Sequence, residues 1–128
     1  MPDNVELIES LWDDFGRGDL DKVARALADR GEVVFPANLP WGGSYEGPEA
    51  FAGVLAEIVG SFADFKAKPE MVLGADDDHV VVVAEIRARS KTGTRLEIRV
   101  AWVYRLRDGK IVRAEVFSDT AAIVEALG

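Results

Sequence analysis

The chain has 128 residues, of which 48% are hydrophobic and 30% are charged, and it contains no cysteine. This balance is typical of one globular domain and excludes disordered, fibrous and membrane-spanning chains. The formal net charge of −8 repels phosphate backbones and anionic lipids, so neither nucleic acid nor a membrane is an expected partner. Without cysteine the chain can form no disulfide, thiolate nucleophile or thiolate metal site.

The N-terminal residues lack the basic start and apolar core of a secretory signal. No apolar run approaches the ~20 residues that span a bilayer. The sequence therefore predicts a soluble, cytoplasmic protein that folds as a single domain over residues 1–128.

Two helices are predicted at the start of the chain. The first is indicated by apolar residues at the three- and four-residue spacing of a helix, namely Val5, Ile8, Leu11, Trp12 and Phe15. Residues 16–18 interrupt it, and Asp19 caps a second helix that ends at Gly31. The buried positions of that second helix are Leu20, Val23, Ala24 and Leu27. A short strand over residues 32–35 follows.

Residues 36–47 combine several glycine and proline breaks with two large aromatics, Trp41 and Tyr45. We expect an ordered loop here, of the kind that often carries function. The run Gly47-Pro48-Glu49 is a helix-start signal, and the apolar positions from Phe51 to Phe62 predict a third helix.

After Phe65 the apolar period changes from that of a helix to that of a strand. Strands are predicted over residues 65–73, 79–90, 95–106 and 110–118, with turn residues at 76–78, 91–93 and 107–109. Such short turns imply antiparallel hairpins. A short terminal helix capped by Asp119 or Thr120 is expected to run to Leu127. The predicted class is α+β, with a curved, mainly antiparallel sheet wrapped around three helices.

The two faces of the sheet follow from side-chain alternation. On strand 95–106 the packed face carries Leu96, Ile98, Val100, Trp102, Tyr104 and Leu106. Strand 79–90 begins apolar on both faces, and we assign Val83 and Glu85 inward. The outer face is then expected to hold Ala84, Ile86, Ala101 and Val103. Because the helices cover only the concave side, this face predicts a symmetric homodimer, with a monomer bearing scattered aliphatic side chains as the alternative.

The runs 38–48 (NLPWGGSYEGP), 107–111 (RDGKI) and 119–122 (DTAA), with the order of elements, resemble a known superfamily. It is the nuclear transport factor 2-like group, within it the SnoaL-like polyketide cyclases and relatives of ketosteroid isomerase and limonene epoxide hydrolase. The resemblance covers nearly the whole chain and implies a cone-shaped α+β barrel with a deep central pocket. This superfold hosts enzymes, ligand carriers and assembly modules, so the resemblance selects no single function.

The known active sites of these relatives do not carry over intact. The position of the isomerase base falls at Asn38, and the positions of its two oxyanion donors fall at Leu11 and Trp102. An amide cannot accept the proton, so isomerisation by that route is not expected. The hydrolase relay falls at Asn38, Pro36, Val116, Val83 and Glu85. Only two of these five positions, Asn38 and Glu85, hold a residue of the chemical type that the relay needs.

Glu85 is the leading catalytic candidate, because a carboxyl that is desolvated in a pocket has a raised pKa and can move a proton. A structural ion pair with Arg87 or Arg99 is the alternative. Asn38 is expected to hold a water or substrate oxygen, or else to shape its loop. Tyr45 completes the catalytic prediction because its hydroxyl needs a partner. Substrate contacts are predicted for Trp41, Arg87, Trp102, Tyr104, Val116, Val83 and Leu11.

One histidine, His79, and scattered acids form no metal-ligand spacing, so no metal site is predicted, and the proposed chemistry needs no cofactor. The expected ligand is a small apolar or aromatic molecule. Three functions remain open: an isomerase, cyclase or hydrolase that uses general acid and base catalysis, a non-catalytic ligand binder, and a dimerisation module.

Overall fold

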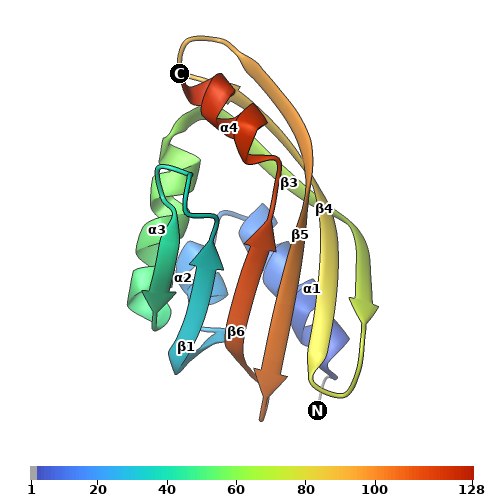
Figure 1. Ribbon diagram of the computed structural model, residues 1–128. Coiled ribbons are helices and arrows are strands. Elements are labelled where there is room, and N and C mark those ends of the chain that lie inside the picture. Colours follow the sequence, from blue (N-terminus) through green and yellow to red (C-terminus); the bar gives the residue numbers. More distant parts are fainter. Residues whose placement is uncertain (1–2) are drawn as a thin grey trace.

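The computed structural model describes residues 3–128, which form a six-stranded sheet and four helices (Figure 1). The helices are α1 (Asn4–Gly16), α2 (Leu20–Ala24), α3 (Pro48–Gly60) and α4 (Thr120–Leu127). The strands are β1 (Leu27–Phe35), β2 (Gly43–Glu46), β3 (Phe62–Gly74), β4 (His79–Ser90), β5 (Arg95–Arg107) and β6 (Lys110–Phe117). The sheet order is β2-β1-β6-β5-β4-β3, and within it β1 and β6 run parallel while the other neighbours are antiparallel. The predicted fold class is confirmed.

Three helices begin at aspartate caps. The carboxylates of Asp3, Asp19 and Asp119 accept hydrogen bonds from backbone amides three residues further on, at 2.8, 3.1 and 3.1 Å. These bonds satisfy amides that the first turn of a helix leaves without a partner. Asp119 is therefore a capping residue, one of the two caps expected for the terminal helix.

The second helix is shorter than predicted. It ends at Ala24, and the chain enters β1 at Leu27, whereas the sequence predicted helix up to Gly31. Leu27 pairs with Ile111 of β6, and the backbone of Ala26 accepts a hydrogen bond from the Ile111 amide at 2.9 Å. Pairing with a distant strand therefore overrides the local helical pattern.

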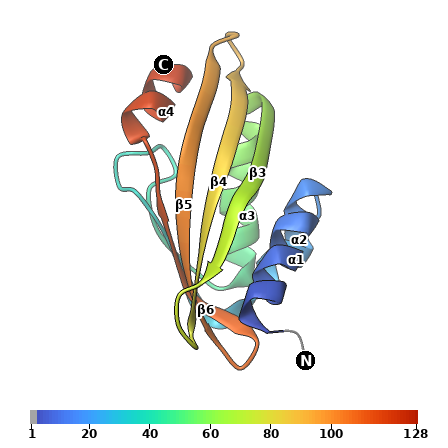
Figure 2. The same ribbon diagram turned by 90° about the vertical axis from the view of Figure 1, so that its right-hand side faces the viewer.

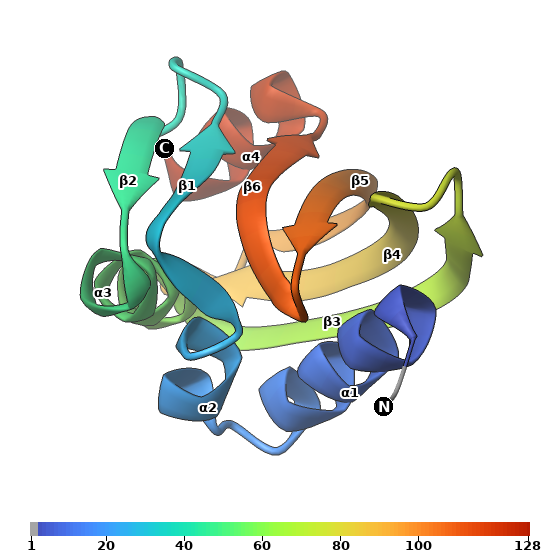
Figure 3. The same ribbon diagram turned by 90° about the horizontal axis from the view of Figure 1, so that it is seen from below.

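The sheet is strongly curved, and the helices close its concave side. Figure 2 shows α1, α2 and α3 on the same side of the long strands β3, β4 and β5. Figure 3, seen from below, shows the sheet bending around an interior that α1 and α3 border. The short helix α4 lies at the end of the molecule away from the N-terminal residues (Figure 1). None of the helices in residues 3–128 combines the length and apolarity that a bilayer-spanning helix needs.

The inward and outward faces of β4 are the reverse of the sequence assignment. Val82 pairs with Trp102 and Ala84 with Val100, and directly paired residues share a face of the sheet. The buried residues of β4 are accordingly Val80, Val82, Ala84, Ile86 and Ala88. The prediction that Val83 and Glu85 point inward, and Ala84 and Ile86 outward, is wrong. The assignment of β5 is confirmed.

Candidate functional site

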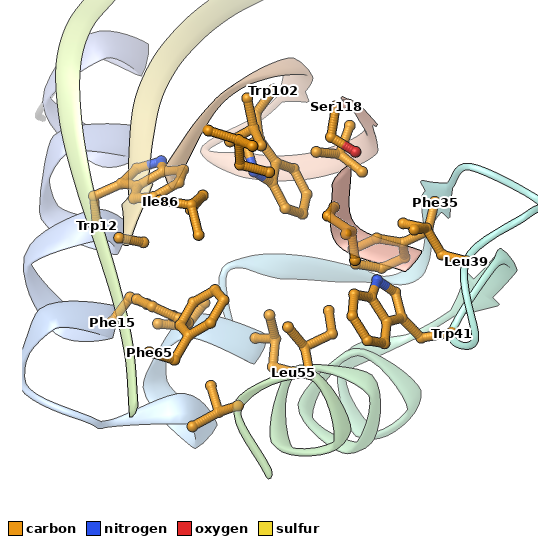
Figure 4. Close-up of a pocket in the computed structure, with 18 of the residues that line it drawn as sticks. Trp12, Phe15, Phe35, Leu39, Trp41, Leu55, Phe65, Ile86, Trp102 and Ser118 are labelled. Carbon is orange, nitrogen blue, oxygen red and sulfur yellow. The ribbon is translucent and has the colours of Figure 1, made fainter. Parts of the chain in front are cut away.

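A cavity of about 100 Å³ lies between the inner face of the sheet and the helices α1 and α3 (Figure 4). Trp12 and Phe15 reach it from α1, Leu55 from α3, Trp41 from the loop before β2, and Trp102 from β5. The cavity is partly open to solvent. Its half-buried lining residues belong mostly to the C-terminal ends of α1 and α3 and to β3, which places the opening there.

A chain of aromatic contacts runs around this cavity, and we call it the aromatic belt. Figure 4 labels six of its members, namely Trp41, Phe65, Phe15, Trp12, Trp102 and Phe35. Its members in contact order are Trp41, Phe62, Phe65, Phe15, Trp12, Trp102, Phe35 and Tyr45, with ring centroids 5.5–6.4 Å apart. The Tyr45 hydroxyl closes the chain by donating to the Trp41 carbonyl oxygen at 2.8 Å. Most of these contacts are edge-to-face, a geometry that adds about 0.5–1.5 kcal/mol per pair to the gain from burial.

Two buried side-chain polar atoms have no hydrogen-bond partner among residues 3–128. They are Nε1 of Trp12 and Oγ of Ser118, and both residues line the cavity. A buried donor left unpaired costs about 1–3 kcal/mol. In native proteins such groups are uncommon and call for an explanation.

The cavity wall carries no formal charge. Within the described part of the chain, none of the lining side chains is a carboxylate, ammonium, guanidinium or imidazole. Tyr104 is the one lining side chain with a titratable proton, and burial raises the pKa of its hydroxyl well above the usual value, while the Trp12 indole N–H opposes that rise. The Tyr104 hydroxyl is therefore protonated and neutral at physiological pH.

Five of the predicted site residues line this cavity. They are Leu11, Trp41, Trp102, Tyr104 and Val116. Trp102 stacks on Tyr104 with centroids 5.7 Å apart, so both belong to one continuous aromatic surface. Their role in binding a ligand stays a prediction.

Three others lie on the opposite, outer face of the sheet. The Glu85 carboxylate pairs with the Arg87 guanidinium at 2.8 Å, and Val83 lies two residues before Glu85 on the same face. The alternative of a structural ion pair for Glu85 is therefore correct. Because these side chains are separated from the cavity by the sheet, they cannot contact a molecule bound there.

Asn38 and Tyr45 hold the loop between β1 and β2. The exposed Asn38 side chain donates to the Thr120 hydroxyl oxygen at 2.8 Å, which ties the loop to the start of α4. The Tyr45 hydroxyl donates a hydrogen bond to the Trp41 carbonyl oxygen. Burial raises the pKa of this hydroxyl, and the negative charge of Glu57 raises it further by a smaller amount. Neither residue lines the cavity, so the loop-shaping alternative for Asn38 fits the structure.

Sequence reasoning missed Trp12 and Ser118 as candidate site residues. Trp12 was placed in the apolar stripe of the first helix, where an indole is usually read as core packing. Its N–H is a hydrogen-bond donor that an apolar stripe cannot satisfy, and this was the available signal. Ser118 follows β6 directly, and no sequence signal separated it from an ordinary strand end.

The cavity is smaller than most ligand sites. Pockets for drug-sized molecules usually measure about 300–1,000 Å³, whereas an enclosed apolar cavity of about 150 Å³ holds one benzene. About 100 Å³ therefore suits a single small ring, with any larger part of a ligand in the opening. Among residues 3–128 no three histidine, aspartate or glutamate side chains come together as metal ligands would.

Comparison with known proteins identifies the family. The SnoaL-like domain matches residues 8–114. No curated protein matches the sequence. Among solved structures, a nuclear transport factor 2-like protein from Burkholderia thailandensis is 25% identical, with a TM-score of 0.93 over 100% of this chain and 99% of that one.

Two further solved structures were determined with small molecules. TerC, co-crystallised with polyporic acid, is 24% identical with a TM-score of 0.87, and 97% of each chain is covered. A protein with a ketosteroid isomerase-like fold from Catenulispora acidiphila, in complex with trimethylamine, is 18% identical with a TM-score of 0.82. That alignment covers 96% of this chain and 92% of the other. At these identities the likeness shows the fold, and the domain match shows that the chain belongs to the SnoaL-like family.

Proposed function

We propose that this protein binds one small, uncharged, mainly apolar molecule in the cavity between α1, α3 and the inner sheet face. The observation that carries the proposal is the aromatic belt around a cavity whose wall has no formal charge. Such a wall gains free energy by removing apolar surface from water and offers an ionic ligand no partner. Two members of the same fold that hold small molecules support a binding role.

General acid and base catalysis by Glu85, Asn38 and Tyr45 is not part of this proposal. Proton transfer requires the acid or base to lie within hydrogen-bond reach of the reacting atom, directly or through one water. Glu85 is on the far side of the sheet, while the Asn38 amide nitrogen donates to Thr120 and the Tyr45 hydroxyl donates to Trp41. Binding without turnover is therefore favoured over the isomerase, cyclase and hydrolase alternatives.

The proposal is tested by titrating the purified protein with benzene and cyclohexanone in a calorimeter. We expect one site per chain and dissociation constants on the order of 0.1–1 mM, as befits ligands of six or seven heavy atoms. Tetramethylammonium, which is compact but charged, serves as the comparison ligand. Absence of heat and of NMR shift changes with both neutral ligands would refute the proposal.

The Glu85→Gln variant separates the binder from the acid–base enzyme. The exchange removes an exposed ion pair on the outer face, and such pairs contribute about 0–1 kcal/mol to stability. We expect the variant to bind benzene and cyclohexanone within about twofold of the native protein. A tenfold loss of affinity, measured by the same calorimetry, would show that Glu85 takes part in ligand binding and would contradict this assignment.

A homodimer through the outer sheet face remains part of the proposal, with corrected residues. The strand register aligns two apolar rows there: Leu73, Val81 and Val103 in one, Met71, Val83, Ala101 and Phe117 in the other. Leu73, Met71 and Phe117 are 51%, 45% and 52% exposed, which is unusual for side chains of this size. Charges of both signs border the rows, including the pairs Glu85–Arg87 and Glu70–Arg99. A second copy related by a two-fold axis would place apolar rows together and opposite charges across from one another.

Sedimentation equilibrium tests the dimer. Native protein is expected to sediment as a dimer at micromolar concentration, and Val83→Lys as a monomer, because the new ammonium would be buried without a partner. Val124→Lys on α4 provides the matched control, since it makes the same exchange at an exposed valine away from the sheet. A monomeric native protein would contradict this interface.

A further inference from the structure

A second hollow lies between α1, α2 and the turn that joins β5 to β6, and we call it the basic groove. The β5–β6 turn is at the end of the molecule away from α4 (Figure 1), and Figure 3 views the molecule from that end. The basic groove has a volume of about 230 Å³ and is open to solvent. It shares one lining residue, Leu11, with the central cavity, and the two hollows otherwise have separate walls.

The floor of the basic groove is apolar. Its apolar side chains come from α1, from the segment before β1, and from β5 and β6, and they are Leu7, Ile8, Leu11, Ala26, Leu106 and Ile111. Leu7 and Ala26 are half-buried, so part of this apolar surface is in contact with water. A ligand that covers the floor gains free energy by removing that surface from water.

Three cationic side chains also line the basic groove. They are Lys22 on α2, Arg25 directly after α2, and Lys110 at the start of β6. Among the lining residues in the described part of the chain, Asp14 is the one carboxylate, so the cations outnumber the anions three to one. In the whole sequence acids outnumber bases by 23 to 15. The basic groove therefore reverses the charge balance of the molecule and attracts anions that the rest of the surface repels.

These cations keep donors free for a ligand. The Lys22 ammonium lies 3.5 Å from the Asp14 carboxylate, which the Arg17 guanidinium also contacts at 3.3 Å. The Lys110 ammonium donates to the Arg25 carbonyl oxygen at 2.8 Å, which holds it beside the end of α2. Among residues 3–128 the Arg25 guanidinium has no ion-pair partner. Because an ammonium has three N–H donors and a guanidinium has five, most of these donors remain available.

We infer that the basic groove binds a small amphipathic anion, an apolar ring system that carries a carboxylate. The carboxylate contacts the Arg25 guanidinium and the Lys110 ammonium, and the ring covers the apolar floor. A guanidinium can hold a carboxylate through two parallel hydrogen bonds, which makes Arg25 the main anchor. This inference goes beyond the proposed function, because both the place and the charge of the ligand differ.

The test compares 2-naphthoate, its uncharged analogue 2-naphthamide, and inorganic phosphate, which lacks an apolar part. Two fused rings exceed the single ring that suits the central cavity. We expect 2-naphthoate to bind native protein with a dissociation constant on the order of 0.1–1 mM, measured by calorimetry. The other two ligands are expected to bind at least about fivefold more weakly, because each lacks one of the two interactions. Salt at about 1 M, which screens charges beyond ~3 Å, should weaken 2-naphthoate several-fold.

The variants Arg25→Gln and Arg30→Gln make the same change of charge at two exposed arginines. Arg25 lines the basic groove, whereas Arg30 lies on β1 and does not line it. We expect Arg25→Gln to weaken 2-naphthoate about five- to tenfold, because a charge-assisted hydrogen bond is lost, and Arg30→Gln to bind it within about twofold of native protein. Circular dichroism checks that both variants are folded.

NMR of ¹⁵N-labelled native protein locates the ligand without any variant. The backbone amide resonances of Ala26 and Lys110, which line the basic groove, are expected to shift with 2-naphthoate. Those of Trp41 and Ala67, which line the central cavity, are expected to stay nearly fixed.

Each outcome bears on the basic groove alone. Absence of 2-naphthoate binding at millimolar concentration would overturn the inference, and so would shifts confined to Trp41 and Ala67. Equal affinity for 2-naphthamide, or equal losses in Arg25→Gln and Arg30→Gln, would show that the groove does not recognise the carboxylate and would overturn it as well. Failure of benzene and cyclohexanone to bind would instead refute the proposed function, since those ligands are expected in the central cavity.

Discussion

Replacement of Trp102 by alanine is expected to lower the free energy of unfolding by about 3–5 kcal/mol, the range typical of a buried tryptophan. Trp102 contacts Trp12, Phe35 and Tyr104, with centroids 6.4, 5.6 and 5.7 Å away. It thereby joins α1, β1 and β5 in one cluster. Its loss would remove all three contacts and leave a void that the curved sheet cannot collapse to fill.

Urea unfolding followed by circular dichroism measures this effect. Val34→Ala on β1 is the control, because Val34 faces outward, is half-buried and lies outside the two apolar rows of the proposed dimer interface. Its expected cost is about 1 kcal/mol or less. If Trp102→Ala cost no more than this control, the cluster would not be the centre of the core, and the account of the fold given above would need revision.

The variant Ala67→Phe is expected to abolish ligand binding, weakening benzene and cyclohexanone by at least about 100-fold, since a phenyl group fills a cavity of benzene size. Ala67 lines the cavity from β3 and is half-buried, so the larger side chain can enter the cavity from its open side. The overpacking cost to stability is expected to be about 1–3 kcal/mol. Calorimetric titration at a temperature where the variant is folded gives the measurement.

The same substitution on the surface of the same strand supplies the control. Ala63 is exposed on β3 and does not line the cavity, so Ala63→Phe should bind both ligands as the native protein does. Undiminished binding by Ala67→Phe would place the ligand elsewhere. The groove between α1, α2 and the β5–β6 turn, which is lined in part by Lys22, Arg25 and Lys110, would then be the next site to probe.

Most of the fold could be predicted because local signals agreed with the final packing. The stripe of α1 and the turn residues around Gly93 and Gly109 describe elements that tertiary structure leaves unchanged. The inner face of β5 could also be predicted from the sequence, because charged residues alternate with large apolar ones along this strand. Where one face of a strand is clearly more polar than the other, side-chain alternation is sufficient to orient the strand.

The candidate site was harder to predict because it depends on strand register. The first half of β4 is apolar on both faces, so its own sequence carries no preference for either orientation. Val82 is turned inward by its pairing with Trp102, a contact across the hairpin that no property of β4 alone encodes. The error on Glu85 follows directly from that choice, since a shift of one residue moves a side chain to the opposite face.

The loop residues illustrate a different difficulty. Asn38 and Tyr45 are polar groups in a segment rich in turn residues, and such groups serve either a ligand or the loop itself. The deciding partners, Thr120 and the Trp41 carbonyl, are set by the path of the folded chain. A cavity is also a property of many side chains together, so individual residue types gave only a partial list of its wall.

The sequence contains three tryptophans, at positions 12, 41 and 102, and all three line the cavity. Every indole fluorophore of the molecule therefore sits within reach of whatever occupies that space. The ultraviolet emission of the unmodified protein should report occupancy directly, with a quinone-like guest quenching it and a saturated one changing mainly its wavelength. The protein is in this sense its own optical sensor, and compound collections can be screened against it without a label.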